Sequence, residues 1–390
     1  MRKGGEVVFH GALGDKSSNL IRYFENAGAS KIEHGENPAT WMLKILGDTS
    51  KDWGEIYRSS SDYAGLKESI EMTVENQNEQ ARVTFNSKYA QSFQQRNRLM
   101  NSRLTLIYWR SPAYNLGRVA ISVVISFILG SVFLNHRHPE QYSETQMQSI
   151  LSTIFIAFII LGVLSIITVL PVMQSIRDVF YRHRLAGMLG HGSLSLALGV
   201  AEKKYIILVS SLFVVIFYFT LGLSLDVRKF VAFWAFFTFN VAIYSYFGQA
   251  FMCLVPGMAT AQILCSVFIG LNNFFSGLIV RPQYMTGLWS FTYWITPGHY
   301  VYEGLVASQF HDDITPVVAF PGSGFFYSLN CTLGQENACI GTVQEYVNDF
   351  FGGKYVYDHI IMDGLVLGAF LAAARILTYV ALKKFNYAYT

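Results

Sequence analysis

The sequence predicts an α-helical membrane protein, with six membrane-spanning helices behind an N-terminal segment of mixed polarity. Two observations lead to this fold class. Of the 390 residues, 52% are hydrophobic and only 14% are charged, which is too apolar for a water-soluble domain of this length. The apolar residues also gather into runs of roughly 20, the length that a helix needs to cross about 30 Å of hydrocarbon.

The chain changes character near Tyr114, where mixed and charged segments give way to the apolar runs. The fourth and fifth runs are separated only by Pro256-Gly257, so these two spans should form a tight helical hairpin. The fifth and sixth are separated by a long connection, residues 281–359. The six expected spans are residues 119–135, 150–173, 203–223, 229–254, 257–280 and 360–382.

Lysine and arginine set the expected orientation, because cytoplasmic loops are enriched in them. Both termini and the connection between spans two and three should therefore be cytoplasmic, and the connection 281–359 should lie outside. That outer loop carries Cys331 and Cys339, which could form a disulfide, and the sequon that makes Asn330 a candidate glycosylation site. The cationic residues used here are Arg96, Arg98, Arg103, Arg110, Arg118, Arg177, Arg182, Arg184, Lys383 and Lys384.

The N-terminal segment shows no catalytic motif. Residues 11–17 resemble a phosphate-binding loop only loosely, because Asp15 separates the glycine from Lys16 and the earlier glycine has the wrong spacing. A structural interpretation fits better: Glu6–Phe9 as a strand, a turn at the glycines, and a helix capped by Ser17 or Ser18. We expect no catalytic residue and no metal site in this chain. The net charge of +3 is spread in short groups, so no nucleic-acid surface is expected either.

A basic amphipathic helix should precede the first span. Its apolar positions recur at helical spacing and its arginines repeat every seven residues. It could serve as a plain interfacial anchor or as a link between the N-terminal segment and the first span, and the two roles are compatible. The positions concerned are Phe93, Met100, Leu104 and Ile107 on one face, and Arg96, Arg103 and Arg110 on the other.

Short motifs run in order along nearly the whole chain, and the most specific is Asn-Pro-Ala-Thr-Trp-Met at residues 37–42. Together they resemble the C-terminal transmembrane half of G-subfamily ABC transporters of the full-size pleiotropic drug resistance type. The motifs are Gly4–Gly11, Tyr23–Glu25, Asn37–Leu43, Tyr108–Asn115, Val179–Arg182, Ala186–Met188, Asn273–Gly277 and Gly304–Phe310.

The resemblance implies a division of the chain. Residues 1–50 would be the C-terminal remnant of a nucleotide-binding domain with a small α/β fold, and 51–92 a cytoplasmic linker. Residues 93–115 would form an amphipathic connecting helix, and 116–390 a six-helix domain of the ABC-2 type exporter fold. In this family the ATP-binding motifs lie upstream of the matched segment, so ATP and Mg²⁺ are expected on nucleotide-binding domains outside these residues. The chain would be either a fragment of a longer protein or a half that needs a separate ATPase.

Between spans two and three, residues 177–184 resemble the coupling segment that receives force from a nucleotide-binding domain. Exposed aromatics between cations would suit a docking surface, whereas an ordinary positive-inside loop would not explain two adjacent aromatics. The family usually has glutamates where this chain has Ile176 and His183, which leaves tight coupling in doubt. The docking residues would be Arg177, Phe180, Tyr181, Arg182 and Arg184.

The same resemblance places a substrate cavity between spans two and five. Apolar and aromatic walls with an amide would suit a flat or lipid-like molecule, although phenylalanines in membranes mostly face lipid or pack helices. The amide of Asn273 in particular needs a partner, either a neighbouring helix or a ligand. Residues 288–294 should form short interfacial or re-entrant helices at the outer face. The cavity candidates are Leu161, Val163, Asn272, Asn273, Phe274 and Phe275.

Ionisable residues at membrane depth are functional candidates by default. Glu202 matches a glutamate of the family, and the alternative is a charge cluster at headgroup level with the neighbouring lysines. We interpret Arg375 as reaching the inner interface. Gly364 and Gly368 form a G-x-x-x-G pattern in the sixth span, which is typical of helix packing.

The predicted function is that of the transmembrane half of an ATP-driven exporter of hydrophobic small molecules or lipids. It would be a multi-pass protein of the plasma membrane rather than the vacuole, embedded in lipid and partnered by nucleotide-binding domains and a homologous half. The alternative is a regulatory half that dimerises with complete transporters without transporting. A passive channel is less well supported, since the spans show no ring of charge. The complete transporter would be an ATP-hydrolysing translocase, and this chain alone lacks the ATP site.

Overall fold

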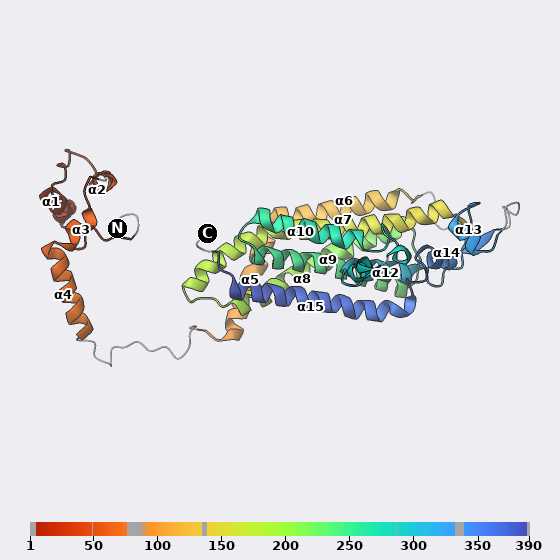
Figure 1. Cartoon of the computed structure of the whole chain (residues 1–390). Helices are drawn as coiled ribbons and strands as arrows, with labels where there is room; N and C mark the ends of the chain where they lie inside the picture. The colour runs from red at the N-terminus through yellow and green to blue at the C-terminus, as the bar shows by residue number, and fades with distance from the viewer. Residues whose placement is uncertain are drawn as a thin grey trace. The chain divides into compact units, whose positions relative to one another are not determined.

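The computed structural model describes residues 5–48, 50–75, 89, 91–134, 139–285, 287–331 and 339–387. The chain divides into two compact units, Met1–Asn86 and Ser87–Thr390. The larger unit is an elongated bundle of roughly parallel and antiparallel helices (Figure 1). It contains all the long apolar helices of the chain's described part.

The described part of the smaller unit is helical. Its helices are α1 (Ser18–Asn26), α2 (Pro38–Gly47), α3 (Trp53–Arg58) and α4 (Ser61–Glu75), preceded by the short 3₁₀ turn η1 (Asp15–Ser17). The strand expected at Glu6–Phe9 is absent, and with it the β part of the expected α/β fold. A strand needs a partner for its backbone hydrogen bonds, and no described segment of this unit supplies one.

The Asn-Pro-Ala-Thr-Trp-Met motif has a local physical role in this unit. The Asn37 side chain accepts a hydrogen bond from the Ala39 N–H at 2.9 Å, and Pro38 occupies the first turn of α2, where its missing N–H costs nothing. Trp41 then packs into a small core with Phe24, and its Nε1–H donates to the Ser30 carbonyl at 3.1 Å. The motif therefore starts a helix and anchors it to its neighbours.

Five helices among the described residues are long and apolar enough to cross a membrane. They are α6 (Pro112–Ser131), α7 (Glu144–Leu185), α8 (His191–Leu221), α9 (Val227–Leu254) and α15 (Ile360–Lys384), the last preceded by the turn η6 (Tyr357–His359). The predicted helical membrane protein is thus confirmed, whereas six full-length spans are not. The fifth predicted span is the shorter α10 (Met258–Phe274), joined to α9 by three residues as a hairpin.

The α7 helix is much longer than the span predicted within it. Its 42 residues correspond to a length of about 63 Å, roughly twice the hydrocarbon thickness. The helix begins with a capping box in which Ser143 and Gln146 satisfy each other's backbone N–H groups. It continues to Leu185, so residues 177–184 form its last turns and are not a loop.

The basic amphipathic helix is observed as α5 (Phe93–Trp109), which begins with a capping box at Ser92. Its buried residues are Met100, Leu104 and Tyr108, and it packs mainly against α8. Proline 112 then opens α6 in the position that the first helical turn favours. Protein therefore covers the apolar face of α5 at Met100 and Leu104, whereas Phe93 at its start is exposed.

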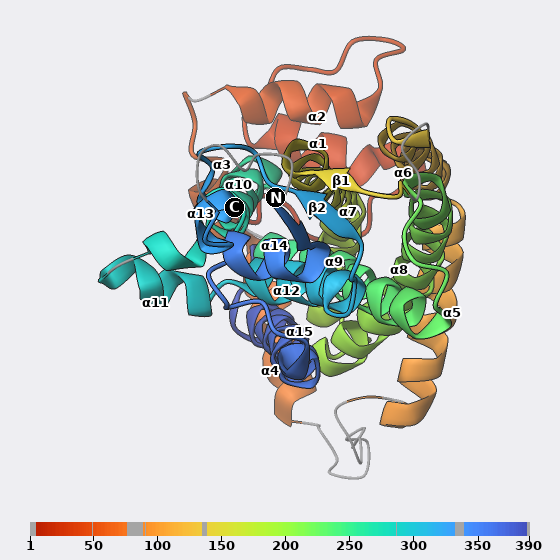
Figure 2. The same cartoon turned by 90° about the vertical axis from the view of Figure 1, so that its right-hand side faces the viewer.

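Between α10 and α15 the chain forms a cap at one end of the bundle, and its helix α12 (Pro297–Phe310) also packs into the bundle against α9 and α15. The cap contains a three-stranded sheet in which β1 (Tyr142–Ser143) runs parallel to β2 (Pro316–Val318), and β2 runs antiparallel to β3 (Ile340–Thr342). Figure 2 shows α11 standing out from the neighbouring helices. Its side chains Trp289, Phe291 and Trp294 are exposed. The remaining elements are η4 (Pro282–Tyr284), α11 (Leu288–Trp294), α12 (Pro297–Phe310), α13 (Gly324–Ser328) and α14 (Val343–Phe350).

A disulfide joins Cys331 and Cys339 within this cap, with a Cα–Cα distance of 6.1 Å. Asn330 lies next to it, exposed and in the left-handed backbone region (φ 56°) that asparagine tolerates. The third residue of its sequon, Thr332, lies outside the described residues. Cys253 and Cys265 are free thiols buried between helices.

Aromatic and small residues fill the core of the bundle. Phe213 and Phe217 of α8 pack on Phe237 of α9, with ring centroids 5.5 to 6.3 Å apart. Gly304 lets α12 approach α9 so closely that a methyl group there would overlap the Phe236 ring. Gly364, in contrast, has open space at its Cα, as does the second glycine of the G-x-x-x-G pattern. That pattern therefore mediates no packing within the described chain.

We expect Gly304→Ala to destabilise the bundle by about 1–3 kcal/mol, because the new methyl group must displace a buried ring. Gly364→Ala is the matched control in another helix. It adds no clash and should stabilise the helix slightly, since alanine is a better helix former than glycine. Thermal unfolding of the purified chain in detergent measures both. Equal shifts in the unfolding temperature would contradict the packing described for α12.

Candidate functional site

A buried ion pair lies at the centre of the bundle. Nη1 of Arg118 in α6 is 3.0 Å from Oε1 of Glu202 in α8, and the side chains are 1% and 0% exposed. Glu202 also accepts a hydrogen bond from the Tyr114 hydroxyl, and Arg118 Nη2 donates to Ser245 Oγ at 2.9 Å. Glu202 and Arg118 are therefore both held inside the chain, and neither side chain lies on its surface.

Two further helices join this pair. Gln249 of α9 donates from Nε2 to Oε2 of Glu202 at 3.2 Å, and its Oε1 accepts from Nη1 of Arg375 at 2.8 Å. Arg375 of α15 also donates to the backbone carbonyl of Ser195 in α8. The guanidinium of Arg375, which we expected at the inner interface, thus contacts α8 and α9 within the chain. We call these residues the polar network: Tyr114, Arg118, Ser195, Glu202, Ser245, Gln249 and Arg375.

The polar network holds the bundle together rather than forming a polar pathway through it. A buried ion pair is tolerated only when additional hydrogen bonds satisfy its remaining lone pairs and protons. Both carboxylate oxygens of Glu202 are satisfied, by donors from α6 and α9. Moving α6 or α8 alone would separate the two charges in an apolar interior, and moving α9 or α15 alone would break the hydrogen bonds of Gln249 and Arg375.

Arginines near the end of α7 bind the ends of other helices. Arg177 donates to the carbonyls of Met252 and Val255, both at 2.6 Å, and to that of Pro256 at 2.7 Å. Arg184 donates to the carbonyls of Leu382 and Lys383 at 2.9 and 3.0 Å. These carbonyls belong to the last turns of α9 and α15 and to the residues after α9, where the helix supplies no partner and its dipole favours a positive charge.

The expected docking surface is therefore largely occupied within the chain. Phe180 and Tyr181 are only 1% and 3% exposed, and Arg177 is buried as well, so the expectation of exposed aromatics is wrong. The helix continues through this segment and turns these side chains inward. Arg182 remains exposed, and His183 contacts Arg103 of α5 at 3.2 Å between Nδ1 and Nη1. Ile176, where the family usually has glutamate, is buried in the core.

The cavity candidates converge on a tyrosine that the sequence analysis did not single out. The hydroxyl of Tyr244 accepts from Asn272 Nδ2 at 2.6 Å and donates to Asn273 Oδ1 at 2.9 Å. Asn272 Oδ1 in turn accepts the N–H of Gly298 at 2.7 Å. Gly162 of α7 leaves room for the tyrosine ring, since a Cβ there would lie 2.9 Å from it.

The six candidates fall into two groups. Leu161, Asn272 and Phe275 are buried and hold α7, α10 and α12 in place. Phe274 is exposed, and Val163 and Asn273 are half-buried, so these three can still meet another molecule. A buried aromatic at position 244 in an apolar helix carried no distinguishing signal in the sequence, because its role depends on which residues face it.

The long helices, the α9–α10 hairpin and the polar interior define a recognisable membrane unit. Residues 96–310, more than half of the chain, match the family of ABC-2 type transporters. The chain belongs to this family. The matched region extends from α5 to the end of α12 and contains the polar network except for Arg375.

Curated relatives of this ABC-2 type chain carry the names of G-family transporters. ABC transporter G family member 31 of Arabidopsis thaliana is 29% identical over 91% of the chain, and member 32 is 29% identical over 99%. Pleiotropic drug resistance protein 1 of Nicotiana tabacum is 30% identical over 99%. The match covers 24% of the first relative and 26% of the other two, so the chain spans about a quarter of their length.

Two buried carboxylates of this ABC-2 type unit lie near the cap and were also missed. Glu303 of α12 is 3.0 Å from His359 through Oε1 and Nδ1, and it accepts the N–H of Val356. Burial raises the pKa of Glu303, while the hydrogen bonds from His359 and Val356 act in the opposite direction. Asp363 is buried at the start of α15. An acidic residue inside an apolar segment was the available signal for both.

Replacing Glu202 with leucine should destabilise the chain by about 3–5 kcal/mol, because Arg118 is left buried without a counter-charge. The double variant Arg118→Met/Glu202→Leu should lose clearly less than the sum of the two single variants. Arg182→Met, at an exposed arginine, is the control and should change little. Denaturant titration in mixed micelles measures the free energy of unfolding of the unaltered chain, the two single variants, the double variant and the control. Strict additivity would show that the two charges do not depend on each other.

Proposed function

We propose that this chain is the transmembrane half of an ATP-driven exporter that moves hydrophobic small molecules or lipids out of the cytoplasm. Nucleotide-binding domains and a homologous transmembrane half would be its partners, either in the same polypeptide or in a dimer. The observation that carries the proposal is the ABC-2 type membrane unit itself. Its helix α7 is longer than a membrane span, and one face of α10 is exposed. Export across the plasma membrane, with both termini cytoplasmic, is part of the proposal.

An exposed stripe on α10 supports pairing with a second half. Ile263, Val267, Leu271 and Phe274 are spaced by four, four and three residues, so they lie on one helix face, and all are exposed. Lipid could cover such a stripe, but the half-buried amide of Asn273 beside it favours a protein or ligand partner. We place the substrate cavity at this face, between Val163 of α7 and Phe274 of α10.

The nucleotide-binding domains would act on the end of the bundle where α5 meets α7. Arg103 and His183 join these two helices, and the exposed Arg182 lies in the same turn of α7. A force on the α7 end would be passed through Arg177 and Arg184 to the ends of α9 and α15. The polar network would then move the four helices together.

ATP and Mg²⁺ would bind on the partner domains, because residues 11–17 do not fit a phosphate group. A phosphate loop presents free backbone N–H groups at a helix N-terminus. Here the N–H of Asn19 donates to the Leu13 carbonyl at 2.9 Å, and that of Ser17 donates to the Gly14 carbonyl at 3.2 Å. Lys16 also lies in the left-handed backbone region (φ 48°). No chemical step of ATP hydrolysis is assigned to this chain.

Phe274, the last residue of α10, and Phe275, which follows it, give a matched test. Phe274→Ala should lower transport severalfold and leave the unfolding temperature unchanged, because the ring is 48% exposed. Phe275→Ala should instead destabilise the protein by about 3–5 kcal/mol, because that ring is 4% exposed and packs in the interior.

The measurement is ATP-dependent uptake of a fluorescent sterol or drug-like amphiphile into inside-out vesicles. The vesicles carry a transporter in which this chain is joined to its nucleotide-binding domains, and uptake without ATP and Mg²⁺ is the background. If Phe274→Ala transports every hydrophobic probe as fast as the unaltered protein does, α10 does not line the proposed cavity. An absence of ATP-dependent uptake in the unaltered protein, despite correct folding, would overturn the exporter proposal.

A further inference from the structure

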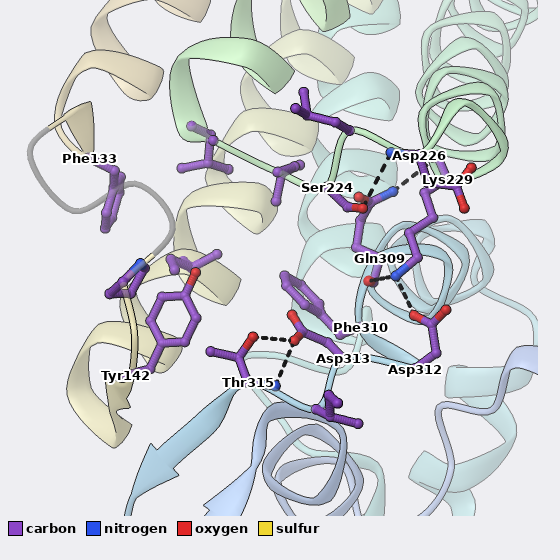
Figure 3. A pocket seen from close by; sticks show the side chains of 17 residues that line it. Phe133, Tyr142, Ser224, Asp226, Lys229, Gln309, Phe310, Asp312, Asp313 and Thr315 are labelled. Atoms are coloured by element: carbon purple, nitrogen blue, oxygen red, sulfur yellow. Dashed lines mark hydrogen bonds and ion pairs between the residues drawn. The ribbon is translucent and has the colours of Figure 1, made fainter.

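A pocket of about 540 Å³ lies at the end of the bundle that carries the three-stranded sheet (Figure 3). It is formed by Phe133 and Pro139 after α6, by β1, by the turn between α8 and α9, and by the end of α12 with the residues that follow. None of the cavity candidates of the transport proposal lines it. Its volume is in the range of pockets that enclose small organic molecules.

The pocket has apolar and aromatic walls. Figure 3 shows Phe133 and Tyr142 on one side and Phe310 on the other. These rings come from three different parts of the chain, so the apolar surface surrounds the space rather than forming one flat patch. The principal apolar lining residues are Phe133, Tyr142, Ile150, Leu221, Leu223 and Phe310.

The charged lining residues are predominantly acidic. Three carboxylates, Asp226, Asp312 and Asp313, face one ammonium group, that of Lys229, which gives the described lining a formal net charge of −2. Lys229 is already engaged, since Nζ forms an ion pair with Asp312 and donates to the Gln309 carbonyl at 3.0 Å. This pair also lowers the pKa of Asp312 against the effect of burial. The charges of Asp226 and Asp313 therefore have no cationic partner among the described residues.

Asp313 is oriented by its own loop. The backbone N–H and the hydroxyl of Thr315 both donate to Oδ1, at 3.0 and 2.6 Å, which leaves Oδ2 without a donor among the residues that the structure describes. Burial raises the pKa of Tyr142, and the charge of Asp313 raises it further, which places this carboxylate within electrostatic reach of the tyrosine on the opposite wall. An aromatic ring and a free carboxylate oxygen thus face the same space.

We propose that this pocket binds an organic cation with an apolar body, such as a quaternary ammonium compound. Aromatic faces and carboxylates both attract such a cation, and the apolar walls accept its body. An anion would be repelled by the two unpaired carboxylates, and a neutral molecule would gain nothing from them. A hard metal ion is a poor fit, because no group of three acidic, histidine or cysteine side chains in the described chain converges closely enough to hold one. The proposal does not rest on transport.

Phenyltrimethylammonium is the probe, with benzenesulfonate as an anion of similar size. Saturation-transfer difference NMR on the full chain in phosphatidylcholine nanodiscs, with empty nanodiscs subtracted, gives both affinities. The cation should bind, and the anion at least tenfold more weakly. Equal affinities for the two ions, or no binding of the cation, would overturn the proposal.

The double variant Asp226→Asn/Asp313→Asn should weaken binding of the cation about tenfold, the size expected when two charges near a cation at the protein surface are removed. Asparagine keeps the oxygens that accept from Arg228 N–H and from Thr315, so the local fold is retained. Asp349→Asn, at a carboxylate of α14 outside this pocket, is the matched control and should bind as the unaltered chain does. Unchanged affinity in the double variant would overturn the proposal.

Salt provides a test that needs no substitution. Raising NaCl from about 0.05 to 0.5 M should weaken binding of phenyltrimethylammonium to the unaltered chain severalfold, because the carboxylates lie near the surface and are screened. The neutral isostere tert-butylbenzene should show no such weakening. Salt-independent binding of the cation would show that apolar contact alone holds it, contrary to the proposal.

Discussion

The arrangement of the membrane unit depends on the ion pair between Arg118 and Glu202. Neither charge reaches water, so each must be matched where it lies. The matching groups come from α6, α8, α9 and α15, which fixes how these helices lie against one another. The same requirement recurs at the helix ends, where Arg177 and Arg184 of α7 satisfy carbonyls that α9 and α15 cannot satisfy themselves. Directed polar contacts thus specify a bundle whose apolar packing alone would allow several arrangements.

Composition and run length were enough to predict a helical membrane protein, because these quantities respond to the solvent and not to particular neighbours. The arginines show the limit of this kind of inference. Arg118 and Arg182 look alike to a rule that counts positive charge near spans, yet the former is buried in the polar network and the latter is exposed. Which way a cation turns depends on whether a carboxylate lies on a facing helix. Glu202 is 84 residues away from Arg118 in sequence, so no local pattern could connect them.

Errors of the local interpretation have a similar origin. The segment Glu6–Phe9 has the residue types of a strand, but a strand forms only where another strand or edge accepts its hydrogen bonds. The segment after the second span was interpreted as a docking surface with exposed aromatics, whereas helix α7 continues through it and buries Phe180 and Tyr181. In both cases we predicted the structure from residue types, whereas the structure that forms depends on which other segments pair with or pack against these residues. Where the signal was a turn, as at Pro256-Gly257, local chemistry was sufficient to predict the α9–α10 hairpin. The helix cap expected at Ser17 or Ser18 makes no side-chain hydrogen bond to the helix.

The division of the cavity candidates follows from the same logic. Tyr244 binds both Asn272 and Asn273 through one hydroxyl, and Asn272 then holds the start of α12 through Gly298. An amide that stabilises the fold cannot also be given up to a ligand without leaving a buried group unpaired. Asn273 differs because it is half-buried beside the exposed Phe274, and its Nδ2 has no acceptor in the part of the chain that the structure describes. A molecule at this face would therefore meet one available amide and an apolar stripe, a combination that discriminates by shape and apolar area more than by hydrogen bonding.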